Sequence, residues 1–185
     1  MKSLLVPALL AFATVAPVSA QKMGSANSNA PSCTSSITAG DMTVEVKFFS
    51  IVWGKTMENL TSEKGEAIRT RVNNSAEKAP LGELKTNADI MLGGKAVKAG
   101  SYSLFFTIDK DLKWHLNLAA KDGAKMDWTL DLKDSGHELK RLHVGITAGD
   151  EAGSARLNVG FGKQWGMVAI AAGAKDGDKE GKGGH

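Results

Sequence analysis

Cysteine is almost absent from this sequence. Cys33 is the only one among 185 residues, so no intrachain disulfide can form, and the paired Cys spacings of zinc sites are missing. A single thiol in an oxidising compartment is either buried and inert or free to bridge to another chain, and we expect Cys33 to be buried. The four histidines also lack the H-x-H and H-x-x-x-H spacings that bring two imidazoles to one metal ion.

No charge of one sign dominates the chain. It carries 23 Lys and Arg against 20 Asp and Glu, for a formal net charge of +3, and the two kinds are interspersed. A nucleic-acid-binding protein would usually carry a basic stripe with interleaved aromatic residues, and the sequence has no such stripe. We therefore expect no nucleic-acid partner.

Long apolar runs are confined to the N-terminus. Lys2 precedes the apolar stretch 4–15, and Val18-Ser19-Ala20 has the small-residue pattern that signal peptidase accepts. An uncleaved anchor is the alternative, but the stretch is shorter than the roughly 20 residues that cross a bilayer. The sequence therefore predicts a signal peptide over residues 1–20, no transmembrane segment, and a periplasmic or secreted protein.

Two segments contain little of the apolar surface that offsets the entropy of ordering a chain. Residues 21–38 are predicted to form a flexible N-terminal segment, and residues 173–185 a disordered tail rich in Gly, Lys and Asp. One folded domain is then expected over residues 39–172.

Apolar residues in this domain recur with a period of two, which is typical of strands with one buried face. The pattern covers 43–48, 102–108, 114–118, 128–132 and 142–146, and a further strand ends at 90–92. The last two runs, 157–161 and 167–172, are expected to form a closing hairpin through Gly162. Only Phe105 breaks the alternation, because it falls on a polar face. Short strands separated by Gly and Asp predict an all-β antiparallel sandwich, with a barrel-like arrangement as the alternative.

The one helical pattern lies near residues 60–72. Leu60, Ile68 and Val72 share a helical face there, although Lys64 interrupts it. We expect either one short helix or a long loop.

The motif GKAVKAGSYSLFF, followed by KWHLNLA, resembles the central signature of the bacterial secreted domain-of-unknown-function family twenty-nine eleven. The resemblance implies a secreted β fold and no assigned activity. Where that family has a Trp-Arg-Thr-Gly-Ala-Asn run, this chain has Leu84-Lys85-Thr86-Asn87. The resemblance therefore offers Lys85 and Asn87 as ligand-binding candidates, although Lys lacks the bidentate fork of Arg.

Patterns for catalysis are missing. The sequence has no G-x-S-x-G nucleophile elbow and no phosphate-binding Gly loop. His115 and His143 share the polar parity of their strands and would bind a metal together only if those strands were neighbours. We expect no catalytic residue, no metal and no cofactor. The predicted function is an exported, non-catalytic binding or envelope-associated module, with a hydrolase or metal-dependent enzyme as the alternative.

Tryptophan offers the one further binding candidate. Trp114 and Trp128 alternate with polar residues and are expected in the core. Trp165 lies between Gly162 and Gly166 in the expected hairpin turn, where an exposed aromatic ring could stack on a sugar or contact an apolar peptide. A small molecule, a glycan or an envelope protein is the expected partner, and the sequence defines neither its identity nor the oligomeric state.

Overall fold

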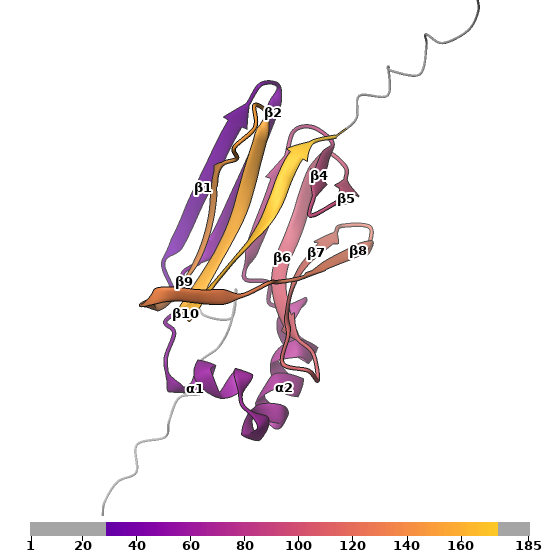
Figure 1. Cartoon of the computed structure of the whole chain (residues 1–185). Coiled ribbons are helices and arrows are strands. Elements are labelled where there is room, and N and C mark those ends of the chain that lie inside the picture. Colours follow the sequence, from indigo (N-terminus) through magenta and orange to yellow (C-terminus); the bar gives the residue numbers. More distant parts are fainter. Residues whose placement is uncertain (1–28, 174–185) are drawn as a thin grey trace, which may run out of the picture.

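The fold is a sandwich of two antiparallel β-sheets (Figure 1). The computed structural model describes residues 29–173. Within them the elements are β1 (Ser32–Ala39), β2 (Met42–Phe49), α1 (Lys55–Glu58), the 3-10 turns η2 (Asn59–Thr61) and η3 (Glu63–Gly65), α2 (Glu66–Ala76), β3 (Gly82–Thr86), β4 (Ile90–Leu92), β5 (Lys95–Val97), β6 (Gly100–Ile108), β7 (Trp114–Ala120), β8 (Lys125–Thr129), β9 (Lys133–Ala148) and β10 (Ser154–Ala172). The predicted all-β sandwich is confirmed, and α2 confirms the predicted short helix.

The larger sheet has six strands in the order β1-β2-β3-β6-β7-β8. Its strands bury every second residue, as the period of two predicts. In β2, Val44 and Val46 are fully buried, whereas Glu45 and Lys47 lie on the opposite face. The sequence pattern therefore identifies the core face of this sheet.

The smaller sheet has the order β5-β4-β10-β9. Its two long strands, β9 and β10, are paired, and their register shifts on both sides of Gly162. Gly162 has a φ of 53°, a conformation that glycine adopts readily and that is typical of bulges. Figure 1 shows that β10 changes direction near its middle. The predicted hairpin of two strands is therefore wrong, because residues 162–166 belong to one bent strand.

Contacts link the two sheets at both lateral edges. On one side, the Ile146 N–H of β9 donates to Ser35 Oγ of β1 at 2.9 Å. On the other side, Trp128 Nε1 of β8 donates to the Leu92 carbonyl of β4 at 2.7 Å. Residues 51–53, which follow β2, also pair with β9. The two sheets are thus connected on both sides, as in a barrel, but each sheet keeps its own set of paired strands.

The core lies between the sheets and includes a cluster of aromatic rings. Trp53 stacks on Phe161 with centroids 4.3 Å apart, and Trp114 lies 4.5 Å from the same ring. Phe106 meets Trp114 edge-on at 6.4 Å. Trp114 and Trp128 are both buried, which confirms their predicted place in the core.

Helix α2 explains why Phe105 breaks the alternation of β6. Phe105 points away from the core but is buried, because Val72, Ala76 and the segment after α2 pack over it. The Asn73 amide fixes the helix to the sheet, since it donates to the Ile108 carbonyl at 2.8 Å and accepts the Ile108 N–H at 3.0 Å. A helix on the outer face thus buries a ring that the strand pattern alone would leave in water.

Strand β1 changes the predicted N-terminal boundary of the domain. The sequence predicts a flexible segment over residues 21–38, but residues 32–38 form most of β1 and pair with β2 along its length. Cys33 lies in this strand opposite Phe48 and is half-buried. Backbone pairing, which orders a strand of low apolar content, accounts for the difference.

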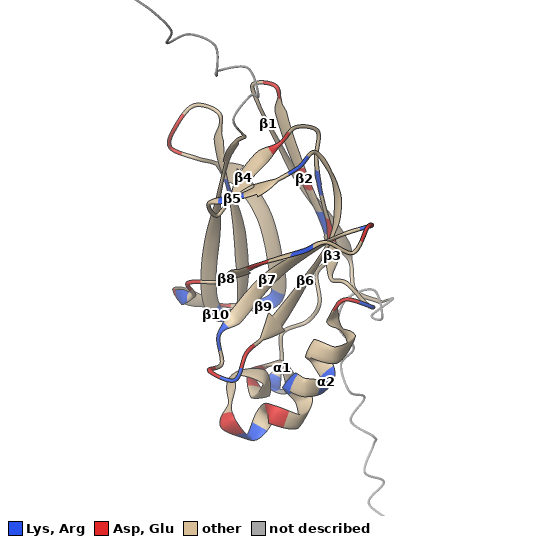
Figure 2. Ribbon diagram, turned by 90° about the vertical axis from the view of Figure 1, so that its right-hand side faces the viewer, with Lys and Arg blue, Asp and Glu red and all other residues tan. Residues whose placement is uncertain are grey.

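The other predicted boundaries lie mostly outside the described residues. The signal peptide at 1–20 and the tail from 174 fall there, while Gly173 donates its N–H to the Asp89 carbonyl at 2.8 Å. Within residues 29–173, no helix has the length and apolar character needed to cross a bilayer. Acidic and basic positions are interspersed over the face shown in Figure 2.

Candidate functional site

The predicted candidates Lys85 and Asn87 lie at the end of β3 and are exposed. Lys85 pairs with Glu83 at 3.4 Å. The Asn87 amide accepts the Thr43 N–H at 2.7 Å and donates to the Asp41 carbonyl at 3.1 Å. Asn87 therefore fastens the β1–β2 turn to β3, and its amide is occupied by the fold itself.

Trp165 lies in the other sheet, apart from Lys85 and Asn87. It is half-buried in β10, opposite Lys133 of β9. Its ring stacks on His143 with centroids 5.6 Å apart and planes 15° apart. The ring also covers Gly160, where an added Cβ would lie 2.4 Å from Trp165 Cε3. A stacked partner and a glycine without a side chain therefore fix the orientation of Trp165.

A surface groove of about 560 Å³ runs beside Trp165. It is lined by Asp131, Lys133, Asp134, Ser135, His137, Trp165, Gly166 and Met167. Met167 is 53% exposed, one of two large apolar side chains that are strongly exposed in residues 29–173. Asp131 pairs with Lys133 at 3.4 Å, and Asp134 accepts the Gly136 N–H at 2.8 Å. The groove, named the Trp165 groove below, combines the apolar side chains of Trp165 and Met167 with polar and charged side chains.

His143 supports the Trp165 groove from beneath the ring. It lies between Trp165 and Phe48, whose ring it meets edge-on at 6.2 Å. His143 itself is exposed, and partial desolvation of its imidazole lowers the pKa of His143 below its usual value. The imidazole is therefore neutral at neutral pH and acts as an uncharged stacking partner.

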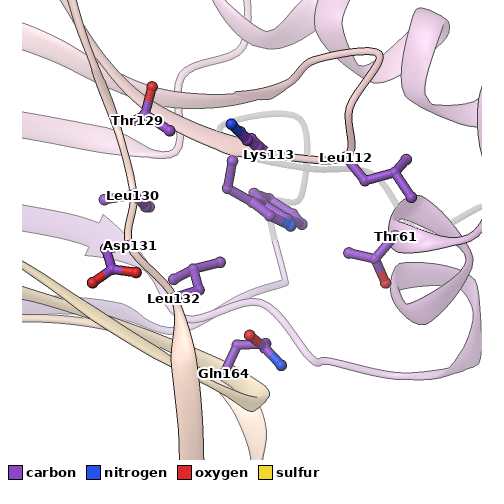
Figure 3. Close-up of a pocket in the computed structure, with 9 residues that line it drawn as sticks. Thr61, Leu112, Lys113, Thr129, Leu130, Asp131, Leu132 and Gln164 are labelled. Atoms are coloured by element: carbon purple, nitrogen blue, oxygen red, sulfur yellow. The ribbon is translucent and has the colours of Figure 1, made fainter.

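A second hollow, of about 580 Å³, lies where η2, the start of β7, the connection between β8 and β9, and β10 approach one another (Figure 3). It is lined by Thr61, Leu112, Lys113, Trp114, Thr129, Leu130, Asp131, Leu132 and Gln164. We call it the Trp114 hollow. The sequence does not predict this hollow. The alternation of apolar and polar residues places Trp114 in the core, but it does not show which part of the core borders a surface hollow.

The Trp114 hollow and the Trp165 groove are neighbouring sites that share one lining residue, Asp131. Gln164 lines the hollow, whereas the next residue, Trp165, lines the groove. Leu132 and Lys133 divide in the same way. Because consecutive side chains of an extended chain point to opposite faces, Gln164 and Trp165 line different sites, while Asp131 borders both.

The Trp114 indole N–H is the unusual group in this region. Trp114 is 3% exposed, and its Nε1 has no hydrogen-bond partner among the described residues. Within residues 29–173 it is the one side-chain nitrogen or oxygen that is both fully buried and unpaired. The Nε1 of Trp128, by contrast, is satisfied by the Leu92 carbonyl.

The two histidines weighed as metal ligands lie in different sheets. His115 of β7 places Nε2 3.1 Å from Asp109 Oδ2 and Nδ1 3.4 Å from Asp127 Oδ2. His143 of β9 contacts the rings of Phe48 and Trp165 instead. Within the described part of the chain, no group of three His, Cys, Asp or Glu side chains is arranged to hold a metal ion.

Comparisons with known proteins return no match. No family model matches the sequence, and searches of curated proteins and of solved structures find no similar chain. The resemblance to the domain-of-unknown-function family twenty-nine eleven therefore stays a prediction, and the function has to be argued from the residues of this chain.

Proposed function

We propose that the protein is an exported, non-catalytic module that binds a saccharide in the Trp165 groove. The observation that carries the proposal is the orientation of Trp165, which His143 and Gly160 hold beside an open groove with polar walls. A ring that is already fixed loses little conformational entropy when a ligand stacks on it.

The chemistry of the groove suits a sugar ring. A pyranose has an apolar face of C–H groups and an edge of hydroxyl groups. Trp165 and the exposed Met167 offer apolar contact, while Asp131, Asp134 and His137 offer hydrogen-bonding groups around them. An apolar peptide would contact the ring but would make no use of the polar groups of Asp131, Asp134 and His137.

A hydrolase is the second candidate, because of one arrangement on β7 and its neighbours. Thr129 Oγ1 lies 3.4 Å from His115 Nδ1, and Asp109 Oδ2 lies 3.1 Å from His115 Nε2. Hydroxyl, imidazole and carboxylate occur in this order in serine hydrolases. However, Asp127 Oδ2 contacts the same Nδ1 at 3.4 Å, so a carboxylate competes with the hydroxyl for that nitrogen. Binding without catalysis therefore fits the geometry better.

Export is tested by the mass of the mature protein. Cleavage after Ala20 would leave Gln21 as the first residue. Intact-mass analysis of protein secreted or released from the periplasm should give this species. Recovery of the full-length chain in the membrane fraction would contradict export as a cleaved protein.

Saccharide binding is tested by calorimetric titration with maltotriose, cellotriose and chitotriose. At least one should bind, and Trp165→Ala should weaken binding by about tenfold or more. Trp165→Phe keeps an aromatic face and should lose less. Lys163→Ala, which changes an exposed residue of the same strand outside the groove, is the control and should bind normally.

Two results would contradict the saccharide proposal. One is the absence of binding by all three sugars, and the other is equal affinity in wild type and Trp165→Ala. Hydrolysis of p-nitrophenyl acetate that is lost in both Thr129→Ala and His115→Ala would favour the hydrolase instead.

A further inference from the structure

The Trp114 hollow contains a hydrogen-bond donor that the fold leaves unused. Trp114 Nε1 is buried and has no acceptor among residues 29–173. A buried donor without a partner costs about 1–3 kcal/mol, and native proteins satisfy the great majority of such groups. Because an indole N–H can only donate, the missing partner is an acceptor.

The ring that carries this donor is held in place. Trp114 packs against Phe161 at 4.5 Å, Trp53 at 5.8 Å and Phe106 at 6.4 Å. Its three aromatic neighbours prevent the indole from turning towards a carbonyl elsewhere in the core. The N–H is therefore held in one orientation. It has almost no accessible surface, so an acceptor reaches it only when the side chains that cover it move aside.

The walls of the hollow define what such an acceptor would be attached to. Leu112, Leu130 and Leu132 provide apolar surface. Figure 3 shows Thr61, Leu132 and Gln164 around a common space. The Gln164 amide can donate or accept beside the indole. Apolar walls with a few polar groups are typical of small-molecule sites.

Charge in the lining argues against an ionic ligand. Lys113 and Asp131 are the only charged residues that line the hollow, and their charges cancel. Asp131 is also paired with Lys133 at 3.4 Å. A charged ligand would lose hydration in this hollow without a net opposite charge to offset the loss.

We propose that the Trp114 hollow binds a small uncharged molecule in which a carbonyl oxygen is attached to an apolar body. The carbonyl accepts the Trp114 N–H, and the apolar body contacts the leucine walls. This site differs from the Trp165 groove in its indole donor and its leucine walls, although Asp131 borders both.

The test uses benzamide as the probe and the Trp114 indole signal as the readout. In ¹H–¹⁵N spectra of the mature protein, the signal missing from Trp114→Phe identifies Trp114. Benzamide should shift this signal saturably, since a new hydrogen bond changes its chemical shift. Trp114→Phe removes the N–H but keeps an aromatic ring, and it should weaken benzamide binding by about tenfold.

Three comparisons make the result specific. Benzylamine has a similar apolar ring but is cationic and lacks an acceptor, so it should not shift the Trp114 signal. Gln164→Leu should weaken benzamide binding less than Trp114→Phe does. Trp165→Ala should leave benzamide binding unchanged even if it abolishes saccharide binding. The two proposals can therefore fail independently of each other.

The proposal is overturned if benzamide gives no saturable shift, if benzylamine binds as well as benzamide, or if Trp114→Phe retains the full affinity. A Trp114 signal that shows contact with water alone, before and after benzamide is added, would also overturn it. The signals of the other three tryptophans in Trp114→Phe report whether that variant is folded, so a loss of binding through misfolding would be recognised.

Discussion

The indole N–H of Trp128 donates to the backbone carbonyl of Leu92 at 2.7 Å, a bond that joins the edge of one sheet to the other. Trp114 has the same indole group at similar burial but no acceptor within the described part of the chain. The two residues therefore form a matched pair in which only one N–H stabilises the native state.

This pair gives the first prediction. Trp128→Phe and Trp114→Phe remove the same atoms, but only Trp128→Phe leaves a buried carbonyl without its partner. We expect Trp128→Phe to lower the free energy of unfolding by about 1–3 kcal/mol more than Trp114→Phe does. Urea denaturation followed by circular dichroism measures both values. Equal losses would show that the bond to Leu92 contributes nothing.

Truncation of Trp114 tests its role in packing. Trp114→Ala should destabilise the protein by about 3–5 kcal/mol, because it opens a cavity beside Phe161 and Trp53. The same denaturation experiment measures this. A loss below about 1 kcal/mol would mean that the ring cluster repacks or is not built as described.

Gly160 tests how Trp165 is held. An added Cβ would lie 2.4 Å from Trp165 Cε3 and 2.6 Å from Leu139 Cδ1, so Gly160→Ala must displace at least one of them. We expect Gly160→Ala to lower the free energy of unfolding, measured by urea denaturation, by about 1–3 kcal/mol. The fluorescence of Trp165 should also change. Gly54→Ala is the control, since Gly54 has a φ of −140° and an added Cβ meets nothing within 4 Å. Equal stability in the two variants would contradict the close approach.

Asp109 should contribute a pH dependence to stability. Its carboxylate accepts the backbone N–H of Lys113 and contacts His115, and these bonds lower the pKa of Asp109. The folded-state pKa is thus below the unfolded value of about 3.9. The stabilisation is present above the unfolded pKa and is lost as pH falls through the folded pKa.

Asp109→Asn should therefore lower stability at pH 7 and reduce the decline of stability in acid. Thermal unfolding measured between pH 2 and pH 7, a range that spans the carboxyl pKa values, tests both effects. Asp111→Asn removes an exposed carboxylate in the same turn and serves as the control. Parallel pH profiles for wild type and Asp109→Asn would contradict the assignment.

The strands could be predicted from the sequence because alternation is a local property. Val44 and Val46 identify a buried face whatever the rest of the chain does. Phe105 could not be placed, because its burial depends on α2, a helix that lies far from it in sequence. The bend at Gly162 suggested a turn, since glycine occurs in turns and in bulges alike and only pairing with β9 distinguishes them.

The candidate sites were predictable to different degrees. Trp165 stands out because an aromatic residue between two glycines is unusual, although its stacking on His143 depends on the β9–β10 register. The ligand-binding role of Asn87 stays a prediction; the contacts of its amide, which connect β3 to the β1–β2 turn, could not be predicted because they depend on the packing of that turn. The Trp114 hollow could not be predicted, because the unpaired state of Trp114 Nε1 depends on which carbonyl groups lie near it in the fold. The alternation of apolar and polar residues carries no information on those neighbours.

The hydrogen bonds on the outer side of β9 also affect how copies of the protein can associate. A long strand at the edge of a sheet usually offers unpaired backbone groups with which another chain can pair, and this is a common route to aggregation. Here Ser35 accepts the Ile146 N–H, and residues 51–53 pair with β9 near Leu142. The longest edge strand of the sandwich is thus already bonded within its own chain near Leu142 and Ile146, so a second copy cannot pair with those backbone groups.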